Sequence, residues 1–349
     1  MSPKNISIIH IPSDIGSLYP GKSRAPAAFT AAGFQTKLQA AGHSIVEYNA
    51  FSSAHFSEPT PVVSATWKPS SRSPNGARNE AETVKACHAV KNTVALALAN
   101  SEKRGTKEDE SKKKNMQFFI GGECLYTPAI LSAYWHHFNP PSPSPTTSKT
   151  MENQASEQKI GIIYMDADTD LYLPNEPSTP GTLASMTLSH LTLRPGSLPS
   201  MAPFSRPNNT AVVTPQIISL FGTNATALAN GPPAHLSYLL DNHFRVHTSS
   251  AVQASPVACA KEALAWIEER VDWIVLHLDV DVINPGSFAL ANVPNFTGLG
   301  YRECLDAFGV FLRSEKVVGV SVAEVNPDHD CEGEMVGRLV GDLVGALGE

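Results

Sequence analysis

Short apolar runs alternate along the chain with longer segments in which apolar residues recur at helical spacing. Runs of strand length are predicted at 6–11, 44–48, 116–120, 161–165, 216–221, 244–248, 273–278 and 317–322. Helices are predicted at 25–41, 80–101, 128–136, 183–191, 235–242, 256–270, 302–312 and 333–347. Because strands and helices alternate from one end to the other, the sequence predicts an α/β fold with a mostly parallel sheet of about eight strands.

Two polar segments interrupt this alternation. Residues 102–115 are dense in charge, and residues 140–158 are rich in Pro, Ser and Thr. Such compositions cannot bury enough apolar surface to offset the entropy of ordering the chain. Because strand patterns continue on the far side of each segment, we expect two flexible surface insertions within a single domain that spans residues 1–349.

The apolar run at 161–165 ends in three carboxylates at alternate positions, Asp166, Asp168 and Asp170. In extended structure these positions share one face, and in a loop they would crowd together just past the strand. Like charges that close repel one another strongly at low dielectric, so a cation is expected among them. A divalent metal ion fits this requirement, and a pair of ions fits it better.

The apolar run at 273–278 ends in the same way, in Asp279 and Asp281. Either cluster alone could cap a helix or form an Asx turn. Two buried-type strands that both end in acid instead predict neighbouring strands of one parallel sheet, with a metal site at their carboxyl ends.

Composition narrows the class of protein. The net charge is −7 and the pI about 5.9, which argues against nucleic acid or an anionic membrane as the partner. The five cysteines are scattered and lack CxxC spacing, which is typical of free thiols in a reducing compartment. No signal-peptide pattern and no apolar run of membrane-spanning length is present. We therefore expect a cytoplasmic protein.

Four short motifs, in order and in strand context, resemble those of the ureohydrolase (arginase/agmatinase) family. They are Gly121-Gly122-Glu123-Cys124, Asp166-Ala167-Asp168-Thr169-Asp170, Asp279-Val280-Asp281-Val282-Ile283-Asn284-Pro285 and Glu324-Val325-Asn326-Pro327. The loop at 21–26 also fits the resemblance, which covers nearly the whole chain. It implies a three-layer α/β/α fold, a centre with two Mn²⁺ ions, a small-molecule substrate and a homo-oligomer.

The resemblance also implies a set of metal ligands, which this chain alters. The ligand positions are Cys124, Asp166, Asp168, Asp170, Asp279 and Asp281, and the family has histidine where this chain has Cys124 and Asp168. Both replacements can bind a divalent ion, and the thiolate would also suit Zn²⁺ or Fe²⁺. Six anionic ligands carry more negative charge than the family set, which should make a metal-bridging water less acidic.

Roles in catalysis follow from the same comparison. Asp170 would accept a proton from the attacking water, and Glu324 stands where the family carboxylate faces the guanidinium group. Ala184 replaces a family histidine that is thought to shuttle protons, and Tyr172 replaces an asparagine that holds the substrate in arginases.

His277 has three interpretations. It lies two residues before Asp279, so in a regular strand both side chains face the same side of the sheet. His277 could replace the missing histidine as proton donor, join the metal site, or be a core histidine beneath it.

The resemblance thus implies a metal-dependent hydrolase that cleaves a C–N bond in a guanidino or amide-like small molecule through a metal-bridging hydroxide. Two alternatives remain. The altered histidines would suit a catalytically inactive arginase-like protein with a structural or regulatory role. A metal-assisted amide hydrolysis of the kind carried out by deacetylases of similar fold is the other.

Overall fold

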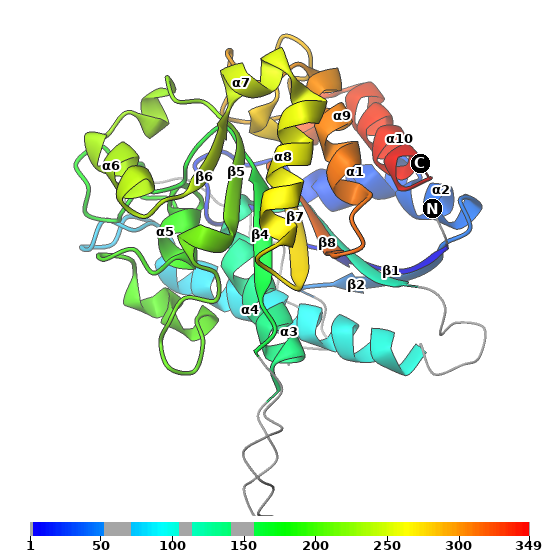
Figure 1. Cartoon of the computed structure of the whole chain (residues 1–349), viewed down its shortest axis with the longest axis horizontal. Coiled ribbons are helices and arrows are strands. Elements are labelled where there is room, and N and C mark those ends of the chain that lie inside the picture. The colour runs from blue at the N-terminus through cyan, green and yellow to red at the C-terminus, as the bar shows by residue number, and fades with distance from the viewer. Residues whose placement is uncertain (1–2, 52–70, 105–113, 141–156, 349) are drawn as a thin grey trace, which may run out of the picture.

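The computed structural model describes residues 3–51, 71–104, 114–140 and 157–348, whose strands form one eight-stranded sheet (Figure 1). The strands are β1 (Lys4–His10), β2 (Ser44–Asn49), β3 (Lys114–Ile120), β4 (Ile160–Met165), β5 (Ile218–Thr223), β6 (Arg245–Thr248), β7 (Trp273–Asp279) and β8 (Val317–Ala323). Their order across the sheet is β2-β1-β3-β8-β7-β4-β5-β6, and every neighbouring pair is parallel. The predicted α/β class and strand number are confirmed.

Helices cover both faces of the sheet and make three layers (Figure 1). One layer contains α1 (Ala25–Ala31), α2 (Phe34–Ala40), α8 (Pro256–Glu268), α9 (Tyr301–Leu312) and α10 (Glu334–Gly348). The other contains α3 (Glu80–Arg104), α4 (Thr127–Phe138) and α5 (Thr187–Leu191). Two short helices, α6 (Pro233–Asp241) and α7 (Ser249–Ala254), lie towards the β5–β6 side of the sheet.

Two details of the predicted helices are wrong. The helix expected at 25–41 is two helices, because the chain breaks at Gly33, whose φ of 77° lies in the left-handed region. Helix α7 was not predicted, since six residues are too few for an apolar period to become visible. Its N-cap is Thr248, whose side-chain oxygen accepts a hydrogen bond from the backbone N–H of Ala251.

The acidic motifs follow strands that are buried on both faces. All of β4 is buried, and so is β7 except for Trp273. This burial explains why their sequences are continuous apolar runs with no polar alternation. The two strands are hydrogen-bonded neighbours, with Met165 opposite Leu278, which confirms the predicted pairing.

Sheet order brings the four motifs to one place. Strands β3, β8, β7 and β4 are consecutive in the sheet, and each motif begins at or just after the carboxyl end of one of them. Parallel strands end at a common edge, so residues far apart in sequence converge there. This edge is where open α/β sheets bind their ligands.

Three further expectations concern the cysteines, membrane-spanning helices and the two polar insertions. The five cysteines are free, as predicted. No helix among the described residues is long and apolar enough to cross a membrane. The insertions expected at 102–115 and 140–158 fall mostly on residues 105–113 and 141–156, which lie outside the described part of the chain.

The packing around β4 leads to a stability prediction. A Cβ added at Gly161 would lie 2.8 Å from the backbone oxygen of Ile217 and 2.8 Å from Val271 Cγ1. Gly161→Val should therefore lower the free energy of unfolding by about 1–3 kcal/mol, the usual effect of overpacking a core. Denaturant unfolding measures this change.

A matched control for that variant is Gly337→Ala in α10, where an added Cβ would meet no heavy atom within 4 Å. This change should raise stability by about 0.5–1 kcal/mol, because alanine is the better helix former. Equal stability of Gly161→Val and the parent would contradict the packing described for β4.

Candidate metal centre

A cavity of about 540 Å³ lies at the carboxyl ends of the central strands. Its lining includes seven of the nine predicted site residues, namely Cys124, Asp168, Asp170, Tyr172, Asp279, Asp281 and Glu324. The other two, Asp166 and His277, are fully buried close to Asp279. A larger cavity of about 800 Å³, lined by residues such as Trp273 and Lys316, lies at the opposite, amino ends of the strands and contains none of them.

The first aspartate cluster folds as a loop, not as a continuation of β4. Strand β4 ends at Met165, and Asp166 Oδ1 accepts a 2.6 Å hydrogen bond from the backbone N–H of Asp168. Asp170 has a φ of 46°, a left-handed conformation that aspartate tolerates better than most residues. Its Oδ2 accepts a 2.6 Å hydrogen bond from the hydroxyl of Tyr164.

The second cluster is tied to the first. Asp279 Oδ1 accepts a 2.9 Å hydrogen bond from the backbone N–H of Asp281. Asp281 Oδ1 in turn accepts a bond of 3.3 Å from the backbone N–H of Ala167. These bonds fix both clusters against each other without neutralising either.

Burial opposes ionisation of these carboxyl groups. It raises the pKa of Asp166, Asp279 and Asp281 well above the ordinary range, and repulsion between neighbouring carboxylates raises it further. Burial likewise raises the pKa of Asp168 to about 6 and that of Asp170 to about 8, although the Tyr164 hydroxyl lowers the latter. A bound divalent cation would remove this penalty.

The described residues offer two groups of metal-binding atoms. One atom each from Asp166, His277 and Asp279 lie within 4.8 Å of one another, and so do atoms from Cys124, Asp279 and Glu324. Asp279 belongs to both groups, as a residue shared between two ions would. Asp168, Asp170 and Asp281 belong to neither, so the predicted six-residue ligand set is only partly gathered here.

His277 has the surroundings of a metal ligand. Its side chain is fully buried, its Nδ1 lies 3.3 Å from Thr127 Oγ1, and its Nε2 has no hydrogen-bond partner. The ring stacks on Tyr164 with centroids 4.5 Å apart. Burial lowers the pKa of His277 to about 3, so the ring is neutral at physiological pH and poorly suited to donate a proton. A hydrogen bond at one ring nitrogen commonly orients the other towards a metal.

Cys124 is a buried thiol with polar contacts to Ala184, Thr187 and Asp170. Its Sγ lies 3.3 Å from the backbone oxygen of Ala184 and accepts a 3.4 Å hydrogen bond from Thr187 Oγ1. Burial and the surrounding carboxylates raise the pKa of this thiol well above its ordinary value. Cys124 would therefore bind metal only with loss of its proton.

The predicted substrate residues both lie in the cavity. Tyr172 packs its ring edge-on against His235 at 4.8 Å between centroids. Glu324 is 8% exposed and has a φ of 62°, with its Oε1 buried and without a hydrogen-bond partner.

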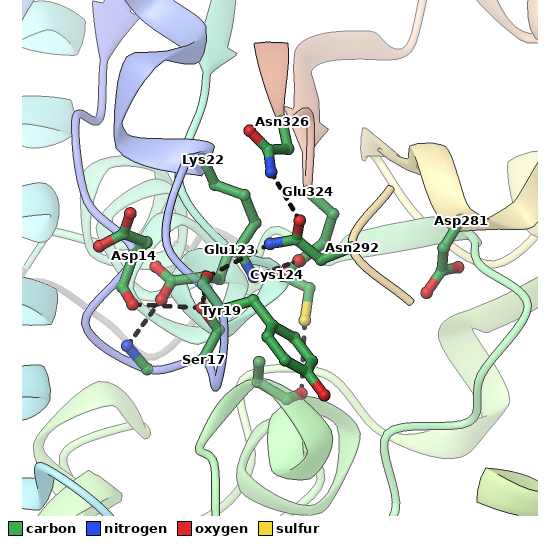
Figure 2. Close-up of polar contacts among 12 residues, drawn as sticks. Asp14, Ser17, Tyr19, Lys22, Glu123, Cys124, Asp281, Asn292, Glu324 and Asn326 are labelled. Atoms are coloured by element: carbon green, nitrogen blue, oxygen red, sulfur yellow. Dashed lines mark hydrogen bonds and ion pairs between the residues drawn. The ribbon is translucent and has the colours of Figure 1, made fainter. Parts of the chain in front are cut away.

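Sequence reasoning missed a lysine beside Glu324. Lys22, in a short 3-10 turn (Lys22–Arg24), places its Nζ 2.5 Å from Glu324 Oε2 (Figure 2). Burial alone would lower the pKa of Lys22, but attraction to Glu324 and Glu123 outweighs it and the pKa rises. The loop at 21–26 had been recognised as part of the resemblance, and a basic residue within it was the available signal.

Glu123 is a further residue of this site that the sequence analysis did not single out, and it is the second acidic residue near Lys22. Its Oε1 accepts a 2.6 Å hydrogen bond from the backbone N–H of Gly16, and its Oε2 has no partner. Burial raises the pKa of Glu123 to about 8. Lys22 thus faces two buried carboxyl groups (Figure 2).

Known proteins are similar to this chain over nearly its whole length. An arginase from Staphylococcus aureus (strain MRSA252) is 23% identical over 348 residues, which cover 98% of this chain and 97% of the relative. The arginase structure from Bacillus caldovelox matches with a TM-score of 0.76 at 20% identity over 99% of both chains. Formimidoylglutamase from Bacillus subtilis subsp. subtilis str. 168 matches with a TM-score of 0.66 at 16% identity, over 99% of this chain and 86% of the other.

The arginase-family model matches residues 4–347. Because this match spans nearly the whole sequence, the chain belongs to the arginase family.

Proposed function

We propose that the chain is a metal-dependent hydrolase that cleaves a carbon–nitrogen bond, other than a peptide bond, in a guanidino or amide-like small molecule. One observation supports this most: Asp279 is common to two groups of metal-binding atoms beside a cavity at the carboxyl ends of the strands. The cavity volume of about 540 Å³ is in the range of small-molecule sites.

The ligand set would consist of Cys124, Asp166, Asp168, Asp170, Asp279 and Asp281, with His277 as a further nitrogen donor. Glu324 belongs to the second group of metal-binding atoms, but its carboxylate is paired with Lys22 and would hold the substrate instead. Carboxylate oxygens suit Mn²⁺, while the thiol and imidazole would also suit Zn²⁺ or Fe²⁺. When bound, the two ions would supply a Lewis acid and lower the pKa of a coordinated water towards neutrality.

The residues of the chain would perform the remaining steps. Asp170, which accepts a hydrogen bond from the hydroxyl of Tyr164, would accept a proton from the attacking water. Tyr172 and Glu324 line the same cavity and would hold the substrate. The relative named formimidoylglutamase indicates that this fold also accommodates compounds other than arginine.

The alternative is a catalytically inactive member with a structural or regulatory role. One observation favours it: Lys22 gives the acidic cavity a cation of its own, so the fold depends less on bound metal. Metal content of protein purified without chelators separates the two proposals.

We also propose a homo-oligomer in the cytoplasm that binds neither nucleic acid nor membrane. The net charge of −7 supports the exclusion of polyanionic partners. Light scattering at micromolar concentration tests self-association, and a monomer would contradict it.

Removing the shared carboxylate should remove the metal. At a Mn²⁺ concentration 100-fold above the dissociation constant, linkage should stabilise the parent by about 2.7 kcal/mol, whereas Asp279→Asn should gain almost nothing. The measurement is denaturant unfolding with and without Mn²⁺, together with elemental analysis. Asp306→Asn, on the exposed side of α9, is the control and should behave as the parent does. Equal metal content in Asp279→Asn and the parent would exclude this site.

Stability of the metal-free protein should fall as the pH rises from about 6.5 to 8. Asp170 and Glu123, each with a pKa of about 8, keep protons in the folded state that they lose in the unfolded state. The folded state therefore binds more protons in this window, and each group should cost up to about 1.4 kcal/mol per pH unit. Thermal melts across this range test the slope, which Mn²⁺ should flatten. A metal-free protein that grows more stable with rising pH would contradict it.

Ordinary arginase activity should be absent or very weak. Ala184 stands where the resemblance implies a proton-shuttling histidine, and loss of a positioned acid or base costs a factor of about 10² to 10⁴ in rate. The measurement is urea release from L-arginine and agmatine with Mn²⁺, Zn²⁺ and Fe²⁺. Ala184→His should raise any such activity, and Ala184→Gln, of similar size, should not. Turnover by the parent above about 10 s⁻¹, the median for enzymes, would show that this expectation is wrong.

A further inference from the structure

The cavity that holds the acidic residues also contains one built-in cation. Among the described residues that line it, Lys22 is the only lysine or arginine, and Asp168, Asp170, Asp279, Asp281 and Glu324 are the acids. The side chain of Lys22 is 3% exposed and that of Glu324 is 11% exposed, so the ion pair between them is not a surface contact. Because the pair is buried, removing one partner would leave an uncompensated charge and lower the stability of the fold.

The loop that carries Lys22 is held rigidly in position. Asp14 Oδ2 accepts hydrogen bonds from the backbone N–H of Gly21, at 2.8 Å, and from the hydroxyl of Ser23, at 3.0 Å. A Cβ at Gly21 would lie 2.2 Å from Asn326 Oδ1. The loop therefore packs directly against Asn326, two residues after Glu324 in the segment that follows β8.

Asn326 extends the same support across the cavity mouth. Its Nδ2 donates a 2.7 Å hydrogen bond to Asn292 Oδ1, and Asn292 Nδ2 donates to the backbone oxygen of Tyr19 (Figure 2). These hydrogen bonds connect the loop, the strand end and the neighbouring turn, and they hold the ammonium beside Glu324.

The ion pair leaves a donor and an acceptor side by side. An ammonium has three N–H groups, and the hydrogen bond that Lys22 makes to Glu324 Oε2 uses one. Glu324 Oε1 is buried and has no partner. A neutral carboxamide or ureido group has the matching pattern, since its carbonyl oxygen accepts and its N–H donates.

We propose that Lys22 determines substrate class: with Glu324 it binds the neutral carboxamide or ureido group of a small molecule and disfavours a guanidinium cation. The inference rests on the proposed hydrolase function and names its substrate. A guanidinium at Glu324 would have to displace Lys22, whose remaining described partner is Glu123, or share one carboxylate with a second cation. Two buried cations in contact repel each other.

An anionic group is disfavoured for the opposite reason, because the rest of the lining carries carboxylates. The neutral group alone meets no like charge. Glu324 lies within 4.8 Å of ligand atoms of Cys124 and Asp279, so a group bound there would be next to the candidate metal ligands. In its hydrolysis the water oxygen would bond to the carbonyl carbon, the C–N bond would break, and the nitrogen would leave as ammonia or an amine with a proton from water.

Matched ligand pairs test the proposal by binding alone. L-Citrulline and L-arginine differ in a ureido against a guanidinium end, and N-carbamoylputrescine and agmatine differ in the same way. Calorimetry on Mn²⁺-treated protein should show the ureido member of a pair binding the parent at least about tenfold more tightly. Lys22→Met keeps the unbranched apolar stem, removes the ammonium and frees Glu324, so it should reverse the preference. Lys37→Met, an exposed change on α2, should leave it unaltered.

The outcomes separate this proposal from the hydrolase proposal. Tighter binding of the guanidinium member by the parent, no binding of any probe, or an unchanged preference in Lys22→Met would overturn the role of Lys22. If Lys22→Met does not fold, Lys22→Gln, which also removes the positive charge but stays polar, should show the same reversal. If the parent binds the ureido compounds more tightly but does not hydrolyse them, the result would contradict the hydrolase proposal and leave the role of Lys22 in specificity intact.

Discussion

Repulsion among buried carboxylates is the constraint on which this structure depends. Strands β4 and β7 pair in the interior of the sheet and deliver Asp166 and Asp279 to the same edge, where Asp168, Asp170 and Asp281 join them. Backbone N–H groups and the Tyr164 hydroxyl fix these side chains but do not cancel their charge. Something else must balance them: protons, metal ions or a protein cation. Each choice gives the cavity a different chemistry.

The chain supplies part of that balance itself. Lys22 compensates Glu324 and faces Glu123, leaving the aspartates at the ends of β4 and β7 to protons or metal. The two acidic regions of the cavity then have different tasks. The aspartates, with Cys124 and His277, are suited to hold ions. The Lys22–Glu324 pair is proposed to recognise a neutral polar group, because its net charge is zero and Glu324 Oε1 has no hydrogen-bond partner.

The sequence predicted what local pattern controls. Apolar runs that end in acid identified β4 and β7, and alternation of strands and helices identified the parallel sheet, because the ends of parallel strands must meet at one edge. Contacts that depend on tertiary packing were not predictable. Lys22 reaches Glu324 across 302 residues, and no local spacing encodes that approach. The break at Gly33 likewise depends on one residue with a left-handed backbone, and the spacing of apolar residues does not reveal that conformation.

The role of His277 also depends on tertiary packing that the sequence does not reveal. Its place two residues before Asp279 predicted the correct face of the sheet, but its three possible roles differ only in what surrounds the ring. The role of metal ligand is favoured by full burial, by the contact with Thr127 at one ring nitrogen and by the absence of a hydrogen-bond partner at the other. None of these three features can be predicted from the spacing of residues in the sequence.

We propose that two metal ions flank Asp279. Anomalous diffraction from a crystal soaked in Mn²⁺ tests it most directly, because the peaks locate the ions without reference to activity. The account predicts two peaks, each adjacent to a carboxylate oxygen of Asp279, one of them also beside His277 and Asp166 and the other beside Cys124. A map with no peak at this edge of the sheet, in protein that is folded and saturated with Mn²⁺, would contradict it.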